Sequence, residues 1–176
     1  MKNIFIGGVA KSGKSTFAKI FLDKARYNHI PLDYFASAFK HKLSDVGITS
    51  NVVIDMNSSQ KYADYLSRVI EIIDCHDELF ILDSAHIMPK DIVKYLDRDK
   101  WDIYYLGYSN ISSKDKFDLI RKYDSSSDWT YKRSDDDLIN TLDKLIDLSK
   151  EIEKECLEYD IKYIDTSYSF NFDNYK

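Results

Sequence analysis

The sequence predicts an α/β protein with a parallel sheet that helices cover on both faces. Short apolar runs alternate along the chain with longer segments whose apolar residues recur at helical spacing, and this alternation is typical of βαβ units. The first apolar run leads at once into a loop that contains three of the five glycines, Gly7, Gly8 and Gly13. Because glycine is needed where a backbone turns sharply or approaches a ligand, we expect this loop to bind a ligand.

Length and composition indicate one domain. The 176 residues are 44% hydrophobic and 31% charged, which is enough for a single core. The net charge of −5 disfavours an extended nucleic-acid partner, because phosphate backbones require a basic surface. No stretch approaches the roughly 18 apolar residues of a membrane span, and the first residues lack the features of a signal peptide. We expect a cytoplasmic domain over residues 1–176, without a membrane partner, as a monomer or homodimer.

The first elements follow from the apolar pattern. Residues 3–6 are almost continuously apolar, which predicts a central parallel strand that is buried on both faces. Residues 14–27 carry an apolar stripe at helical spacing and predict a helix. A short strand at about residues 30–32 leads to Asp33, and a helix at about residues 34–43 follows.

The middle of the chain is predicted to contain one long helix and one buried strand. Ser58 or Ser59 is a candidate N-cap for a helix at about residues 60–75, whose apolar residues define a buried face. Residues 79–82 form the next apolar run, and Asp83 follows it directly. This strand therefore presents a carboxylate at its carboxyl end.

The second half of the chain continues the same alternation. Pro89 suits the first turn of a short helix, and the three aspartates at 135–137 suit the positive end of a helix dipole. The polar stretch at residues 124–128 carries no core pattern and predicts a loop. The elements expected here are helices at about residues 89–96, 112–123 and 135–159, and strands at about residues 103–106 and 161–164.

Residues 8–15 match the pattern G-x-x-x-x-G-K-[ST] of a P-loop without exception. In such a loop the backbone N–H groups converge on phosphate oxygens, and the N-terminus of the following helix adds a positive dipole. Lys14 is expected to reach the β- and γ-phosphates, and the Ser15 hydroxyl is expected to be a Mg²⁺ ligand. The position between a buried strand and a helix favours this interpretation over a capping loop with an exposed lysine. The residues expected to bind the nucleotide are Gly8, Val9, Ala10, Lys11, Ser12, Gly13, Lys14, Ser15 and Thr16.

The sequence resembles the P-loop kinases of the nucleoside-monophosphate-kinase-like group, in the adenylate-kinase-like and small-molecule kinase branch. The similarity consists of the P-loop after the first strand, acidic residues at the ends of the second and third strands, and a polar stretch before the last long helix. It implies a three-layer α/β/α P-loop NTPase fold with a five-stranded parallel sheet in the order 2-3-1-4-5. It also implies ATP or another nucleoside triphosphate, Mg²⁺, an acceptor-side helical segment at about residues 34–78 and a lid-like segment at about residues 121–134.

The resemblance suggests roles for two carboxylates. Asp33 lies where the second strand ends, and in similar kinases this position holds the base that accepts the proton of the substrate hydroxyl. The alternative is that Asp33 caps the helix that follows it. Asp83 ends an apolar run as in a Walker B strand, so it is a candidate Mg²⁺ ligand. Ser84 and His86 beside it are interpreted as polar loop groups.

Two arginines near the lid-like segment are candidate catalytic residues. Lid arginines of similar kinases neutralise charge on the transferred phosphoryl group, and Arg121 and Arg133 flank the polar stretch of this chain. Lys122 competes with Arg121, because only one of two neighbouring side chains is expected to point inward. Solvated surface cations are the alternative interpretation of these residues.

The acceptor-side segment lacks the arginine clamps by which nucleoside monophosphate kinases hold the acceptor phosphate. Its one arginine is Arg68, within a predicted helix, and lysines are poorer bidentate clamps. This favours an acceptor with a free hydroxyl. Tyr34, Phe35 and Phe39 border the expected acceptor pocket, where they either stack on the substrate or pack in the core.

Three functions are compatible with these residues. The first is a phosphotransferase that uses ATP and Mg²⁺ to phosphorylate the hydroxyl of a small-molecule acceptor. The second is a nucleoside or nucleoside monophosphate kinase of the same fold. The third is a nucleotide-dependent switch or binding protein, which is disfavoured because the chain has neither the N-K-x-D segment nor the D-x-x-G turn of a GTPase. The sequence identifies neither the acceptor nor the base of the donor.

Overall fold

The structure, a computed structural model, describes residues 1–175. Among these residues, five parallel strands form one sheet in the order β2-β3-β1-β4-β5, which confirms the predicted fold class and strand order. The strands are β1 (Asn3–Gly8), β2 (Tyr27–Pro31), β3 (Leu79–Asp83), β4 (Trp101–Gly107) and β5 (Lys162–Asp165). β1 is the central strand, and all of its residues are buried.

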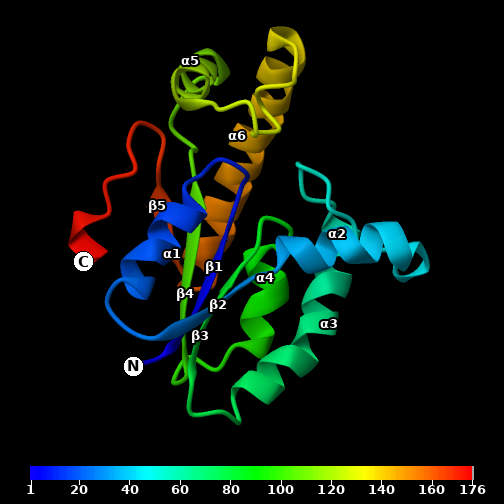
Figure 1. The fold of residues 1–176 in the computed structure, drawn as a ribbon, viewed down its shortest axis with the longest axis vertical. Coiled ribbons are helices and arrows are strands. Elements are labelled where there is room, and N and C mark those ends of the chain that lie inside the picture. The colour runs from blue at the N-terminus through cyan, green and yellow to red at the C-terminus, as the bar shows by residue number, and fades with distance from the viewer. Residues whose placement is uncertain (176) are drawn as a thin grey trace.

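Helices on both faces of the sheet complete a three-layer architecture (Figure 1). They are α1 (Lys14–Leu22), α2 (Asp33–Lys42), α3 (Met56–Ile73), α4 (Pro89–Ile92), α5 (Ser113–Tyr123) and α6 (Asp135–Glu158), with 3₁₀ turns η1 (Ser44–Val46), η2 (Val93–Tyr95) and η3 (Asp173–Tyr175). α1 and the C-terminal tail pack on one face, whereas α3, α4 and α6 pack on the other.

The central strand divides the core between the two faces. Ile4 and Ile6 pack with Phe17 of α1 on one side of the sheet. Phe5, between them in sequence, packs in the larger core on the opposite side. Successive side chains of a strand point to opposite faces, so a continuous apolar run is buried only when both faces are covered. The prediction of a doubly covered strand is therefore confirmed.

The second strand begins earlier than the apolar pattern predicts. α1 ends at Leu22 rather than at residue 27, and Tyr27 already pairs with Leu79 of β3. β2 lies at the edge of the sheet, and its side chains are only partly buried. An edge strand of this kind has no continuous apolar run, so its start is set by pairing with β3 and not by a pattern in its own residues.

The N-cap of α3 is Asp55, and the prediction of Ser58 or Ser59 is wrong. The Asp55 carboxylate accepts the backbone N–H of Ser58 at 2.8 Å. Ser59 instead donates its hydroxyl to Asp91 at 2.5 Å and accepts the N–H of Met88 at 2.8 Å, so it joins α3 to the start of α4. A serine near a helix start looks the same in sequence whether it caps its own helix or bonds to another.

The aromatic C-terminal tail packs on its own domain. The rings of Phe172 and Tyr175 lie 5.1 and 5.2 Å from the ring of Phe17, in edge-to-face arrangements. Figure 1 shows the tail beside α1, after β5. Of the helices that the structure describes, none is both long and apolar enough to cross a membrane.

Candidate active site

The P-loop joins β1 to α1 at the carboxyl edge of the sheet. Gly8 has a φ of +128° and Gly13 a φ of +88°, conformations that residues with a Cβ rarely adopt. A Cβ on Gly8 would lie 1.9 Å from the carbonyl oxygen of Leu106 in β4. A Cβ on Gly13 would lie 2.8 Å from the ring of Phe170 in the tail. Glycine at these positions therefore lets the loop pass close to β4 and the tail.

We expect Gly8→Ala to lower the free energy of unfolding by about 3 kcal/mol or more, because the methyl group meets rigid backbone at a strained φ. Gly47→Ala is the matched control: its φ is +73°, but the added Cβ meets the end of the flexible Lys61 side chain. That variant should lose only about 1 kcal/mol. Urea unfolding monitored by circular dichroism measures both values, and equal losses would contradict the prediction.

Three hydroxyl groups hold the backbone of the P-loop. Ser12 Oγ donates to the carbonyl of Val9 at 2.8 Å, within the loop. The Tyr108 hydroxyl donates to the carbonyl of Ala10 at 2.9 Å, and the Thr166 hydroxyl donates to the carbonyl of Ser12 at 3.0 Å. Tyr108 directly follows β4 and Thr166 directly follows β5. Two of these bonds therefore join the loop to the segments that follow β4 and β5.

Lys14, the P-loop lysine, is buried inside its own loop. Its ammonium donates to the carbonyl oxygens of Gly8 at 3.1 Å and Val9 at 2.8 Å. Burial lowers the pKa of Lys14 below its ordinary value of 10.5, while the charges of Asp33 and Asp83 oppose that shift. The fold therefore brings the lysine and both predicted carboxylates into one electrostatic environment at the edge of the sheet.

Asp83 and Ser15 are the residues predicted to provide oxygen ligands to Mg²⁺. Asp83 is 5% exposed at the end of β3, and its carboxylate contacts Nε2 of His29. Burial raises the pKa of Asp83, and the hydrogen bond from His29 opposes this shift. Ser15 is exposed in the first turn of α1. Among the described residues no cluster of three acidic, histidine or cysteine side chains forms a metal site.

Asp33 is the first residue of α2, and the N-cap of that helix is Leu32. The interpretation of Asp33 as the cap is therefore wrong. Asp33 Oδ1 accepts the backbone N–H of Ala85 at 2.9 Å, while 40% of the side chain is exposed. The N–H of Leu32 donates to the carbonyl of Asp83 at 2.8 Å, which anchors the start of α2 beside the end of β3. One carboxylate oxygen of Asp33 is thus bound to the N–H of Ala85, while the carboxylate as a whole is partly open to solvent.

His86, interpreted from the sequence as a loop group, lies against Asp33. Its Nε2 is 3.6 Å from Asp33 Oδ1, and only 11% of its side chain is exposed. Burial lowers the pKa of His86 below its ordinary value of 6.5, while the charge of Asp33 opposes the shift. The sequence carried no signal of this contact, because the two residues belong to different elements that only the sheet brings together.

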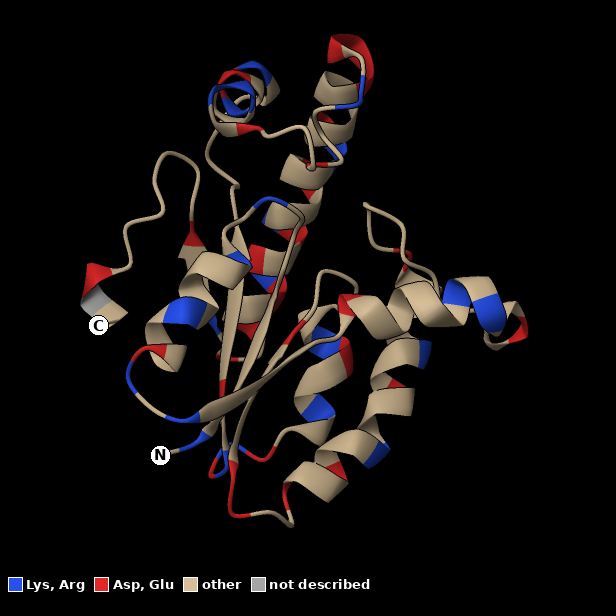
Figure 2. Ribbon diagram, viewed as in Figure 1, with Lys and Arg blue, Asp and Glu red and all other residues tan. Residues whose placement is uncertain are grey.

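The two predicted lid arginines bind groups within the lid-like segment and the start of α6. Arg121 donates to the carbonyl oxygens of Thr130 at 3.0 Å and Arg133 at 2.9 Å, and it pairs with Asp135 at 2.8 Å. Arg133 pairs with Asp137 at 3.0 Å. Figure 2 shows the acidic start of α6 to which both arginines reach. Contact of these arginines with a phosphoryl group stays a prediction.

Lys11 joins the P-loop to the lid-like segment. Its ammonium lies 3.1 Å from Oδ1 of Asp124 and 2.7 Å from Oδ1 of Asp128. The hydrogen bond from Lys11 lowers the pKa of Asp128 to about 2. Phosphate oxygens in the P-loop would compete with these carboxylates for the ammonium, so we expect nucleotide binding to be linked to the position of this segment.

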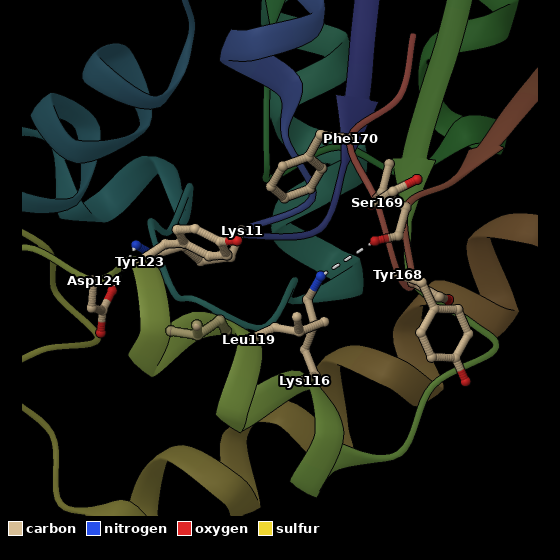
Figure 3. A pocket seen from close by; sticks show the side chains of 11 residues that line it. Lys11, Lys116, Leu119, Tyr123, Asp124, Tyr168, Ser169 and Phe170 are labelled. Atoms are coloured by element: carbon tan, nitrogen blue, oxygen red, sulfur yellow. Dashed lines mark hydrogen bonds and ion pairs between the residues drawn. The ribbon is translucent and has the colours of Figure 1, made fainter.

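A pocket of about 560 Å³ opens beside the P-loop, between α5 and the segment after β5 (Figure 3). Its wall is mainly apolar and includes Leu119, Tyr123 and Phe170. The Lys116 side chain points into the pocket, is 3% exposed, and has its ammonium 4.0 Å from the centre of the Tyr108 ring. A mainly apolar pocket with few polar groups is typical of a small-molecule site.

We expect Lys116→Met to raise the free energy of unfolding at pH 7, because burial lowers the pKa of Lys116 from 10.5 to about 8. The unfolded chain binds this proton more tightly, so the penalty is full below pH 8 and fades as the pH rises toward 10.5. The gain should be up to about 3 kcal/mol at pH 7, less any cation–π energy that is lost.

Urea unfolding at pH 7 and at pH 10.5 tests this expectation, with the exposed Lys114→Met as the control on the same helix. A stability difference between Lys116→Met and wild type that is the same at both pH values would contradict it.

The acceptor-side aromatics divide between core and surface. Phe39 is 6% exposed, so the core interpretation holds for it. Tyr34 and Phe35 are 76% and 50% exposed on α2, so they are not core residues. The Arg68 side chain is 77% exposed and pairs with Glu71 on the surface of α3 at 2.7 Å. Arg68 therefore lies on the protein surface and does not form a buried clamp.

Comparison with known proteins supports the fold. No protein-family model matches the chain, and no curated protein sequence matches it. A solved shikimate kinase from Bacteroides thetaiotaomicron superposes with a TM-score of 0.58 at 14% identity, over 97% of this chain and 90% of that one. The shikimate kinase from Acinetobacter baumannii, solved with shikimate, gives a TM-score of 0.55 at 17% identity, over 94% and 84% of the two chains. The chain therefore has the fold of the small-molecule P-loop kinases.

Proposed function

We propose that this protein is a kinase that transfers the γ-phosphate of a nucleoside triphosphate such as ATP to the hydroxyl of a small molecule. The observation that carries the proposal is the arrangement around Lys14. This lysine lies in a complete P-loop, within the electrostatic reach of Asp33 and Asp83. A lysine at the phosphate-binding position of the motif, beside one carboxylate open to solvent and one buried carboxylate, suits phosphoryl transfer to a hydroxyl.

The donor would bind with its phosphates in the P-loop and its base in the 560 Å³ pocket. Lys11 and Phe170 support this placement because both line the pocket, while Lys11 belongs to the P-loop and Phe170 lies against Gly13 of that loop. Lys14 would turn from the loop carbonyls to the β- and γ-phosphates. Mg²⁺, held by Ser15 and near Asp83, would neutralise charge on the same phosphates.

The acceptor would bind on the other side of the phosphates, next to Asp33. The open carboxylate of Asp33 is suited to accept the proton of an attacking hydroxyl. The surface position of Arg68 supports an acceptor other than a monophosphate, since a phosphate favours a bidentate arginine. The similar solved structures are kinases named for the small molecule shikimate, which supports the same acceptor class.

The proposal is tested by incubating the protein with Mg²⁺ and ATP or GTP and a panel of nucleosides, monophosphates, sugars and hydroxy acids. We expect one hydroxyl compound to stimulate diphosphate formation in wild type but not in Lys14→Met. Stimulation by a monophosphate would show that the acceptor is a nucleotide and that the protein is a nucleotide kinase. Nucleotide binding without stimulation by any acceptor would contradict the proposal and favour a nucleotide-dependent binding protein.

A further inference from the structure

The turn after β3 holds Asp33 and His86 in a fixed relation. The backbone N–H of Ala85 donates to Asp33 Oδ1 at 2.9 Å, and the next residue in the chain is His86. The N–H of His86 donates to Ser84 Oγ at 3.0 Å, and the N–H of Ser84 donates to the carbonyl of Ile6 in β1 at 3.0 Å. Each residue of the turn is therefore tied down, and the imidazole comes to lie 3.6 Å from the carboxylate.

The groups that face His86 keep its ring neutral near pH 7. Burial is the largest influence and lowers its pKa, and the positive charges of Lys14 on α1 and Lys40 on α2 act in the same direction. Asp33 on α2 and a hydrogen bond with the backbone of Asn51 act in the opposite direction. A neutral imidazole beside a carboxylate can take a proton from it, whereas an imidazolium would already be paired with it.

We propose that His86 is a positioning residue that acts through Asp33. Asp33 removes the proton from the acceptor hydroxyl, and His86 then accepts that proton from Asp33. This inference rests on the proposed kinase function. In the step, the hydroxyl O–H bond breaks and its proton goes to Asp33, while the oxygen forms a bond to the γ-phosphorus. The bond from the γ-phosphorus to the bridging oxygen breaks, and its electron pair leaves with the nucleoside diphosphate. The proton then passes from Asp33 to Nε2 of His86 and later to solvent.

The relay would restore the ionised Asp33 within the turnover. Asp33 is partly open to solvent and His86 is mostly covered, so the imidazole lies on the protein side of the carboxylate and leaves the solvent side to the acceptor. The 3.6 Å separation is longer than a hydrogen bond, so the relay requires the two side chains to approach each other when Asp33 carries a proton.

The test is the rate and pH profile of His86→Asn, with the exposed His41→Asn on α2 as the matched control. We expect kcat to fall about 10²-fold in His86→Asn, the lower end of what proton transfer by a side chain contributes, with the KM for the triphosphate unchanged. The acid limb of wild-type kcat/KM should have its midpoint below 6.5, the ordinary pKa of histidine, and should move to lower pH in His86→Asn.

Two further measurements separate a relay from a structural role. Asp33→Asn/His86→Asn should be no slower than Asp33→Asn alone, within about 3-fold, because both residues serve one step. The imidazole pKa of His86, followed by NMR in the wild-type fold, should fall in Asp33→Asn because a negative charge is removed. An additive rate loss, an unchanged imidazole pKa, or an effect confined to the acceptor KM would overturn the relay. The absence of Lys14-dependent phosphate transfer in wild-type protein would overturn the kinase proposal itself. Transfer in wild type with an unchanged kcat in His86→Asn would overturn only the relay.

Discussion

Lys14→Met should reduce kcat by about 10²–10³-fold or more, the effect of removing one preorganised group that stabilises charge in a transition state. The ammonium donates to the carbonyl oxygens of Gly8 and Val9 inside the P-loop, where we expect the phosphates to bind. Methionine keeps the length of the side chain and removes the charge. Diphosphate formation at saturating triphosphate and acceptor measures the change.

The same variant should not unfold the protein. Burial lowers the pKa of Lys14, so at neutral pH the fold bears the cost of a buried cation. Removal of that cation offsets the loss of two hydrogen bonds, and we expect the free energy of unfolding to stay within about 1 kcal/mol of wild type or to rise. A Lys14→Met variant that is stable and still transfers phosphate at the wild-type rate would refute the role of this lysine.

Asp33→Asn should lower kcat by about 10²–10⁴-fold, the usual contribution of a general base. The amide oxygen of asparagine can still accept the N–H of Ala85, so the start of α2 and the P-loop should keep their positions. Triphosphate binding, measured by the ligand-induced rise in Tm, should therefore match that of wild type.

The control for this variant is Asp45→Asn, which changes an exposed carboxylate in η1 of the acceptor-side segment. Asp45→Asn should leave kcat unchanged. Turnover in Asp33→Asn that equals the turnover of this control would remove Asp33 from the mechanism, and would remove the relay through His86 with it.

The P-loop and the two carboxylates could be predicted because their signals are local. The motif at residues 8–15 is contiguous, so it can be recognised without any knowledge of its contacts with β4 and the tail. Asp33 lies two residues after the end of β2, and Asp83 is the last residue of β3. The carboxyl ends of neighbouring parallel strands meet at one edge of the sheet.

The contacts of the site could not be predicted in the same way. His86 and Lys116 are ordinary polar residues in the sequence, and their burial comes from elements distant along the chain. Lys116 lies over the ring of Tyr108, which follows β4, and its pocket is closed by Phe170 of the tail. Arg121 and Arg133 were selected by position in the chain, but their directions depend on the carboxylates and carbonyls around them.

The sequence by itself determined the class of fold, the order in which the main elements occur, and the loop that carries the P-loop motif. These features depend on periodicity and on short motifs, where interacting residues are neighbours in the chain. Only the tertiary structure decided where β2 begins, which serine bonds to α4, and that His86 lies against Asp33. Each of these three features depends on a partner residue that is distant in the chain and is brought close by tertiary packing. Neither of the two segments in such a contact shows it in its own sequence.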